Sequence, residues 1–191
     1  MSVAVRHGRR MRVAEFIEMI RPLPDEERWE LLDGQPVLMA PQSERHQRIV
    51  GNLLDALRRI ARQHGCFALP GLGLLNDFID DYAPIPDVVV RCGPMLPDGY
   101  ARDPIVLAEV LSPSTMGNDR GRKSEFYKSL QTLRTFLLVY QDEVRVEAWH
   151  KEGAEWRFRA FGREGLIPLP ELEGSLAVAD LYADVPLPEA D

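Results

Sequence analysis

Residues Asp103 to Thr115, with the sequence DPIVLAEVLSPST, decide how the rest of the chain is interpreted. The apolar run from Ile105 to Ala108 is followed by a single carboxylate, Glu109, and then by two more apolar residues. Such a run indicates a strand that is buried on both faces of a sheet. An ionised carboxylate inside it is costly unless a hydrogen-bonding or charged partner compensates it. Glu109 therefore either bonds to nearby backbone amides or an arginine, or belongs to a functional site.

A second acid stands at the edge of the preceding predicted strand, in PIPDVVVR. Asp87 follows Pro86 and precedes three β-branched residues, Val88 to Val90. Two inward carboxylates at a similar level on neighbouring strands repel each other unless a cation lies between them. Ligand sets made only of oxygen favour a hard ion such as Mg²⁺ or Mn²⁺. Asp87 and Glu109 thus predict a metal site in which the two carboxylates converge in one cleft.

Composition limits the kind of protein. The chain has 191 residues, of which 45% are hydrophobic and 28% charged, as is typical of one globular domain. We expect that domain at residues 13–185, with a basic lead at 1–12 that lacks the apolar stretch of a signal peptide and a tail at 186–191. No apolar run approaches the ~20 residues of a membrane span. Cys66 and Cys92 show no metal-ligand spacing and are expected to be reduced core thiols. These features predict a cytoplasmic protein that does not enter a membrane.

The charge balance bears on the partner. The net charge is −7, which argues against a broad basic footprint on duplex DNA, because affinity there depends on phosphates neutralised by Lys and Arg. It does not exclude an enzyme that acts on nucleic acid, since a carboxylate-bound metal brings its own positive charge to a phosphate.

Helical spacing and turn signals predict the elements that precede these strands. A short amphipathic helix covers Val13 to Ile20, and a hairpin that turns at Asp33-Gly34 carries Glu30 on its first arm. A long helix follows with Ser43 as its N-cap, and His46 in its first turn points toward the buried side. On their own, Glu30 would be an exposed strand acid and His46 a core histidine. A role beside the metal site is the alternative for both.

The segment after Thr115, MGNDRGRKSEFYKSL, predicts another helix that begins at Asn118 or Asp119. Lys123 and Tyr127 lie four residues apart and therefore share one face of it. Further elements follow from alternation and turn residues: strands at Cys66–Leu69, Gly73–Ile79, Thr135–Tyr140, Val144–Trp149 and Glu155–Ala160, the last two paired as an antiparallel meander, and a capping loop with a short helical turn over Pro168–Val185.

In this order of elements the chain resembles the PD-(D/E)XK restriction-endonuclease-like superfamily, and more closely its Uma-type family. The resemblance spans roughly Val13 to Val185 and implies an α/β fold, with a central mixed β-sheet flanked by helices. The matching pieces are WELLDGQPV (Trp29–Val37), the helix that opens with His46, PDVVV (Pro86–Val90), AEVLSPST (Ala108–Thr115), and Asp119, Lys123 and Tyr127.

The resemblance also implies a set of catalytic residues. Glu30, Asp87 and Glu109 match the metal-binding and catalytic acids. The superfamily places a lysine two residues after the glutamate, but this chain has Leu111 there. The resemblance implies that Lys123 supplies the amine from the following helix instead.

The activity implied by the resemblance is metal-assisted hydrolysis of phosphodiester bonds in nucleic acid, with DNA as the first expectation. Asp87, Glu109 and the carbonyl of Val110 would hold one or two Mg²⁺ or Mn²⁺ ions. His46, outside the first ligand shell, and Tyr127 would lie beside the substrate. A homodimer would let two sites that each make one cut act on two strands.

Other interpretations remain open at this point. The fold alone does not guarantee chemistry, so the chain could be a catalytically inactive interaction module. Lys123 could be a surface lysine paired with Asp119 at four-residue spacing. A serine hydrolase is disfavoured because Ser112 and Ser114 lack the Gly-x-Ser-x-Gly turn.

Overall fold

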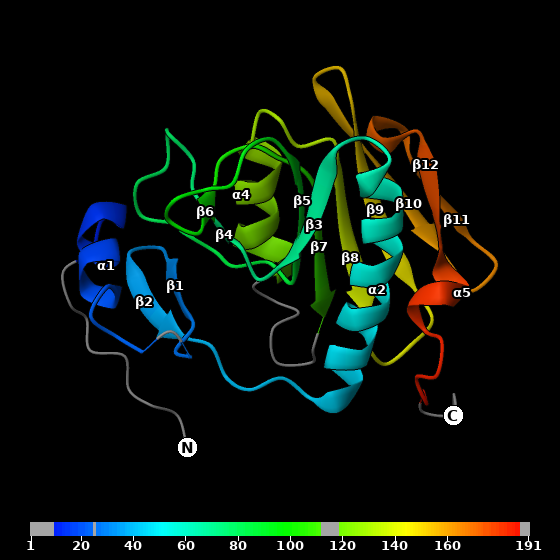
Figure 1. Cartoon of the computed structure of the whole chain (residues 1–191), viewed down its shortest axis with the longest axis horizontal. Coiled ribbons are helices and arrows are strands. Elements are labelled where there is room, and N and C mark those ends of the chain that lie inside the picture. Colours follow the sequence, from blue (N-terminus) through cyan, green and yellow to red (C-terminus); the bar gives the residue numbers. More distant parts are fainter. Residues whose placement is uncertain (1–9, 25, 112–118, 188–191) are drawn as a thin grey trace.

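The computed structural model describes residues 10–24, 26–111 and 119–187 (Figure 1). Several sequence predictions concern residues outside these ranges. These residues are most of the basic lead, the serines Ser112 and Ser114, Asn118 as a possible helix start, and the end of the tail.

A mixed sheet of six strands in the order β10-β9-β8-β7-β5-β3 forms the centre of the fold. Strands β7 and β8 run parallel, and every other neighbouring pair is antiparallel. Because β7 has a strand on each side and helices on both faces, all of its residues except Ile105 are buried. The strands are β3 (Cys66–Pro70), β5 (Val88–Cys92), β7 (Pro104–Leu111), β8 (Thr135–Tyr140), β9 (Val146–Glu152) and β10 (Glu155–Phe161). The predicted mixed sheet is confirmed.

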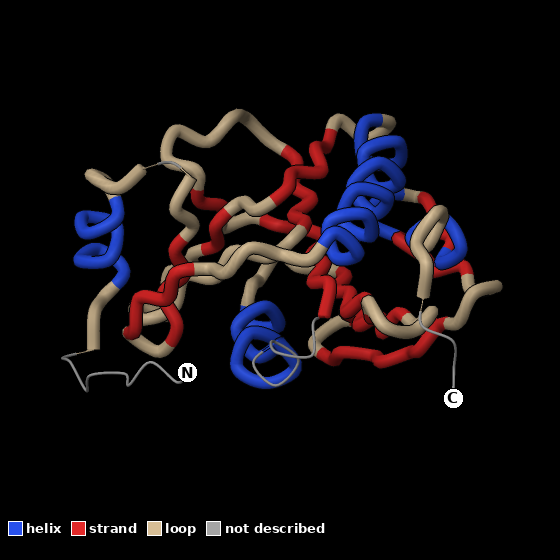
Figure 2. The backbone as a smooth tube through the Cα atoms, turned by 90° about the horizontal axis from the view of Figure 1, so that it is seen from below, coloured by secondary structure: helices blue, strands red, loops and turns tan. Residues whose placement is uncertain are grey.

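Helices cover the two faces of this sheet, and Figure 2 shows α2 and α4 on opposite sides of the strands. On one face α2 (Glu44–Arg62) buries apolar residues such as Leu53 against Val88 and Ala108. On the other face α4 (Ser124–Ser129) packs Phe126 against Leu107. None of the helices in the described ranges has the length and apolar character needed to cross a membrane.

A smaller layer lies at one end of the molecule (Figure 1). It consists of α1 (Val13–Ile20) and the hairpin of β1 (Trp29–Leu32) and β2 (Gln35–Leu38). Asp33 and Gly34 have φ of 48° and 74°, which is the left-handed conformation that a two-residue hairpin turn requires. Leu31 and Ala83 exchange backbone hydrogen bonds of 3.1 and 2.8 Å. The hairpin is thereby fixed to the segment that leads into Asp87.

The helix predicted after Thr115 is interrupted. A π-helical turn, η1 (Asp119–Lys123), precedes α4, and Gly121 in the middle of this turn has non-helical angles, φ −94° and ψ −109°. The turn changes the direction in which the chain enters α4, and Lys123 lies at that junction.

The strand predicted at Gly73–Ile79 is much shorter, since β4 covers only Gly73–Leu74 and pairs with β6 (Tyr100–Ala101). The expected capping loop over Pro168–Val185 is also wrong in part. The segment forms a hairpin whose buried residues, including Ile167 and Leu169, alternate along the strand; this period of two marks a strand, and the prediction missed it. Its elements are β11 (Leu166–Leu169), the 3₁₀ turn η2 (Pro170–Leu172), β12 (Gly174–Ala177) and α5 (Val178–Leu181).

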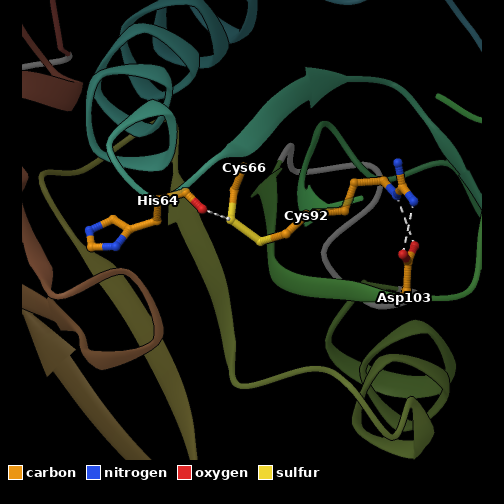
Figure 3. The surroundings of a disulfide bond; sticks show 5 residues. His64, Cys66, Cys92 and Asp103 are labelled. Carbon is orange, nitrogen blue, oxygen red and sulfur yellow. Dashed lines mark hydrogen bonds and ion pairs between the residues drawn. A yellow bond between two sulfur atoms is a disulfide. The ribbon is translucent and has the colours of Figure 1, made fainter. Parts of the chain in front are cut away.

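Cys66 and Cys92 form a disulfide (Figure 3), so the expectation of reduced thiols was wrong. The reason is the strand register. Antiparallel pairing of β3 with β5 places the two residues directly opposite each other, whereas the sequence shows only their apolar neighbours. The cytoplasmic expectation loses the part of its basis that rested on free thiols.

Candidate active site

Glu109 lies near the end of β7, on the face that α4 covers. Alternation along the strand places it between the apolar residues Leu107 and Leu111 on that face. Its side chain is buried, and its Oε1 accepts a hydrogen bond of 2.5 Å from the Tyr127 hydroxyl. The Nζ of Lys123 lies 3.5 Å from the same oxygen. A phenol and an ammonium thus compensate the carboxylate that interrupts this strand.

Lys123 also reaches Glu30 on β1. Its Nζ is 2.8 Å from Glu30 Oε1, and that oxygen accepts a second hydrogen bond of 2.8 Å from the backbone N–H of Ile85. Lys123 is 6% exposed and Glu30 is 5% exposed. Lys123 is therefore not the surface lysine of the alternative interpretation, and Glu30 is not an exposed strand acid. One ammonium joins acids from two separate parts of the fold.

A further link holds this arrangement together. Arg122 Nε donates to Asp33 Oδ1 in the β1–β2 turn, at 3.0 Å, and this hydrogen bond raises the pKa of the Arg122 guanidinium. Arg122 precedes Lys123 directly in η1. The contact therefore fixes the turn that carries Lys123 to the hairpin that carries Glu30.

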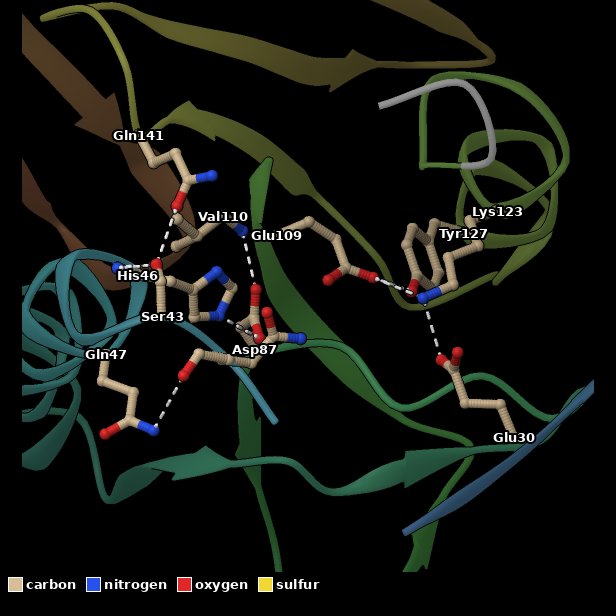
Figure 4. Close-up of polar contacts among 11 residues, drawn as sticks. Glu30, Ser43, His46, Gln47, Asp87, Glu109, Val110, Lys123, Tyr127 and Gln141 are labelled. Atoms are coloured by element: carbon tan, nitrogen blue, oxygen red, sulfur yellow. Dashed lines mark hydrogen bonds and ion pairs between the residues drawn. The ribbon is translucent and has the colours of Figure 1, made fainter. Parts of the chain in front are cut away.

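Asp87 lies just before β5 and bonds to the edge of β7 (Figure 4). Its Oδ2 accepts a hydrogen bond of 2.7 Å from the backbone N–H of Val110. Strand β5 starts at Val88, which is paired with Ala108. The backbone of β5 therefore does not extend alongside Val110, and the Asp87 side chain accepts the hydrogen bond from Val110 instead. The backbone N–H and C=O of one strand residue point toward the same neighbouring strand. The Val110 carbonyl therefore faces the same edge as the Asp87 carboxylate.

His46 supports Asp87 from the first turn of α2. Its Nε2 lies 3.1 Å from Asp87 Oδ1, and its backbone N–H donates to the N-cap hydroxyl of Ser43 at 3.2 Å. The imidazole is 4% exposed, and its Nδ1 has no hydrogen-bond partner among the described residues. Ser43 in turn donates to Gln141, at the end of β8, at 3.3 Å. The sequence did not single out Gln141.

These two networks meet at consecutive residues, Glu109 and Val110. In the view of Figure 4 the Glu109 carboxylate lies between Asp87 and Lys123. Within the described ranges, no three histidine, cysteine, aspartate or glutamate side chains gather closely enough to hold a metal on their own. Convergence of Asp87 and Glu109 on a metal ion remains a prediction.

Arg28 is a basic residue beside this site that the sequence analysis missed. Its guanidinium lies against Gly71, where a Cβ would be 1.7 Å from Arg28 Nη2, and the N–H of Gly71 donates to the Asp87 carbonyl at 3.1 Å. Arg28 is exposed, and its guanidinium makes no hydrogen bond or ion pair with any residue that the structure describes. Its position two residues before Glu30 was the available signal.

Comparison with known proteins shows which family this chain belongs to. Residues 13–180 match the model of the Uma2 family, described as "Putative restriction endonuclease". "Uncharacterized protein sll1609" of Synechocystis sp. is 32% identical over 133 residues, which are 66% of this chain and 74% of that protein. "Uncharacterized protein slr1290" of the same organism is 32% identical over 100 residues, 51% of this chain, and the match spans about half of that relative, 53%.

A solved structure has the same fold. It is described as the crystal structure of a "putative nuclease belonging to DUF820" from Anabaena variabilis, and it superposes with a TM-score of 0.65 over 87% of this chain and 97% of that chain. The sequence identity is 18%, so this likeness concerns the fold, which is the predicted restriction-endonuclease-like one. With the family match over residues 13–180, the chain belongs to the Uma2 family of restriction-endonuclease-like proteins.

Proposed function

We propose that this protein is a metal-dependent endonuclease that hydrolyses phosphodiester bonds in nucleic acid. The observation that carries the proposal is the position of Lys123, whose ammonium lies 2.8 Å from Glu30 and 3.5 Å from Glu109. Leu111 occupies the superfamily's usual lysine position, and Lys123 delivers an amine to the same glutamate from the next helix. A buried lysine with two acids is costly to build for stability alone.

The oxygen atoms around β7 fit a hard divalent cation. Asp87, Glu109 and the carbonyl of Val110 would hold Mg²⁺ or Mn²⁺, with water completing the shell. Mg²⁺ is commonly bound in this way, through one or two carboxylates and several waters, so a third acidic ligand is not required. When bound, the ion would polarise the scissile phosphate and lower the pKa of a bound water.

The chain's own residues would handle the proton and the developing charge. Lys123 would orient the attacking water or stabilise negative charge on the phosphate. Glu30 accepts hydrogen bonds from Lys123 and Ile85, which holds the ammonium in place. Tyr127 is fully buried with its hydroxyl on Glu109. We therefore assign it a positioning role, so that it acts on substrate through Glu109.

Two further residues would act around Asp87. His46 orients its carboxylate through Nε2, and the buried imidazole would contact the substrate backbone only through the Nδ1 side. Arg28 is exposed beside Gly71 and would bind a substrate phosphate, because arginine donates two parallel hydrogen bonds to phosphate oxygens.

DNA is the substrate that we propose first. Cleaving both strands of a duplex needs two sites, which a homodimer would supply. The net charge of −7 makes a small number of local contacts, such as that of Arg28, more important than a broad basic surface.

The direct test is cleavage of four substrates, namely supercoiled plasmid, linear duplex DNA, single-stranded DNA and RNA, with Mg²⁺, Mn²⁺ or EDTA. We expect cleavage of at least one of them with either metal and none with EDTA. Glu109→Gln should abolish it while leaving the melting temperature within a few degrees. Absence of cleavage together with absence of Mn²⁺ binding would instead support a catalytically inactive interaction module.

A further inference from the structure

The sheet face that α4 covers continues beyond this helix onto β9 and β10. Trp149 on β9 is opposite Phe158 on β10, and residues directly opposite in a sheet project from the same face. The two rings are 4.9 Å apart. Trp156 lies two residues before Phe158 on β10 and therefore projects from that face too. Trp149 and Trp156 pack against the apolar cluster that includes Phe126 of α4. We call Trp149, Trp156 and Phe158 the aromatic shelf.

Phe158 is the exposed member of the aromatic shelf. It is 49% exposed, whereas Trp149 and Trp156 are half-buried. Strand β10 ends the sheet order, so in the described part of the chain no further strand of this sheet lies beyond it. Exposed apolar surface that gathers in one place, here three aromatic rings, marks a binding surface.

Two lysines accompany these rings. The Nζ of Lys128 lies 3.2 Å from the centre of the Trp149 ring, and the Nζ of Lys151 lies 5.8 Å from that of Trp156. Neither lysine forms an ion pair with an acid that the structure describes. Glu147, an acid on the same face of β9, is 5% exposed and already hydrogen-bonded. The lysines therefore make the aromatic shelf basic on a protein whose net charge is −7.

The aromatic shelf adjoins the candidate active site. Lys128 directly follows Tyr127, whose hydroxyl donates to Glu109. Across the sheet, Glu109 on β7 lies in one row with Ala160 on β10, by way of the paired residues on β8 and β9. Three steps between neighbouring strands make this row about 14 Å long, which corresponds to about four stacked nucleotides. One strand of nucleic acid can therefore lie on the aromatic shelf and reach Glu109.

We propose that the aromatic shelf binds single-stranded DNA. Unpaired bases would stack on Phe158 and Trp156. The phosphates would lie beside Lys128 and Lys151. Aromatic side chains bind unpaired bases through their ring faces, and aromatic residues on an open sheet face can hold two or three successive bases. The bases of a duplex are stacked on one another and offer no such face. The choice of DNA rests on the proposed function, which this inference narrows to substrates with an unpaired segment.

A second copy of this chain is the other possible occupant, and the charges disfavour it. Two shelves placed face to face would bring Lys128 and Lys151 of both copies together, and like charges at an interface oppose association. Sedimentation measures this directly. A wild-type dimer that Phe158→Ala converts to a monomer would assign the aromatic shelf to a contact between copies and overturn the proposal.

Fluorescence anisotropy tests the proposal on the full chain, in EDTA so that binding is measured without cleavage. The labelled probes, of about 20 nucleotides, are oligo-dT, oligo-U, a DNA duplex and an abasic DNA strand, which has phosphates but no bases. Oligo-dT should bind at least ten-fold more tightly than the duplex or the abasic strand. Phe158→Ala should weaken oligo-dT binding five-fold or more, the loss expected for one stacked base, and leave abasic binding unchanged. Lys151→Gln should weaken both.

Phe67→Ala is the matched control. Phe67 is 53% exposed on β3, the strand at the opposite edge of the sheet, and its removal should leave oligo-dT affinity unchanged. If Phe158→Ala fails to fold, Trp156→Ala takes its place with the same expected loss. Wild-type affinity in the shelf variants, or equal affinity for duplex and single strand, would contradict the proposal. Tighter binding of oligo-U than of oligo-dT would also contradict it, because the ligand would then be RNA.

Binding and cleavage can fail separately. A chain that cleaves duplex DNA but does not prefer single strands would leave the proposed nuclease in place and overturn this inference. Shelf-dependent binding of oligo-dT by a chain that cleaves none of the substrates would support this inference and count against the nuclease.

Discussion

Lys123 and Glu30 form a buried ion pair of 2.8 Å between the turn before α4 and the first strand of the hairpin. The pair joins the small layer of α1, β1 and β2 to the helix that packs on the central sheet. Its second acid, Glu109, belongs to the central strand β7. The same ammonium therefore serves the packing of the fold and the proposed chemistry, and variants at Lys123 should report on both.

The first prediction concerns stability. Lys123→Met should lower the free energy of unfolding by about 3 kcal/mol, because it leaves buried carboxylates without their ammonium. Urea denaturation measures this change. The double variant Glu30→Gln, Lys123→Met should recover at least half of the loss, since one of the two acids is then neutral. Equal stabilities for the single and double variants would show that the pair is not coupled.

A second prediction separates the role of Tyr127 from substrate binding. Tyr127→Phe removes the hydroxyl that donates to Glu109 and should cost about 1–3 kcal/mol of folding free energy. It should lower kcat of the nuclease ten-fold or more with little change in KM, because the side chain is fully buried.

The matched control for Tyr127 is Tyr82→Phe. Tyr82 is also buried in the same apolar cluster, but its hydroxyl makes no hydrogen bond with Glu109. It should therefore leave kcat unchanged. A rise in KM without a change in kcat for Tyr127→Phe would assign Tyr127 to substrate binding after all.

The sequence carried most of the fold because its apolar runs are unambiguous. The central strands β5, β7 and β8 follow from short apolar runs, Val88–Val90, Ile105–Ala108 and Phe136–Tyr140, and the β1–β2 turn follows from Asp33-Gly34. These signals are local, so one sequence is enough to read them.

Contacts between distant segments were harder to predict. The spacing of Lys123 permits a surface pair with Asp119 as readily as a buried one with Glu30, and local periodicity does not foresee the break at Gly121 that precedes Lys123. The Cys66–Cys92 disulfide depends on strand register, which apolar composition does not encode. Arg28 lies against Gly71, whose N–H bonds to the Asp87 carbonyl, and the sequence does not show that these distant segments meet.

The third prediction concerns Arg28 and substrate affinity. Arg28→Gln should raise KM for nucleic acid five-fold or more with kcat nearly unchanged. The slope of log affinity against log salt concentration should become smaller by about the amount expected for one phosphate contact. Arg62→Gln is the control, because Arg62 is exposed at the end of α2 and carries the same charge. Equal KM values for the two variants would remove Arg28 from the site.

The fourth prediction uses the titration of Glu171. Burial raises the pKa of this carboxyl, while Thr135, His150 and Arg134 lower it. A carboxyl whose pKa is higher in the folded state holds its proton there longer than in the unfolded chain. Stability is therefore lost as pH rises from the unfolded value, ~4.3, through the higher folded value.

Glu171→Gln should remove that loss. Its melting temperature should exceed the wild-type value at neutral pH, and the difference should shrink toward zero below about pH 4, where both states of the wild-type carboxyl are protonated. Melting curves across this pH range check it. A difference that does not depend on pH would mean that the gain has another origin.

The central claim is that Asp87 and Glu109 bind a divalent ion, and Asp87→Asn tests it with least damage to the fold. Asparagine keeps an oxygen to accept the 2.7 Å hydrogen bond from Val110 but removes the negative charge. The decisive measurement is a calorimetric Mn²⁺ titration of the wild type and this variant. We predict one or two sites in the wild type, at least a ten-fold weaker affinity in Asp87→Asn and a melting temperature within a few degrees of wild type. Equal Mn²⁺ affinity in both proteins, or no binding to the wild type, would contradict the account.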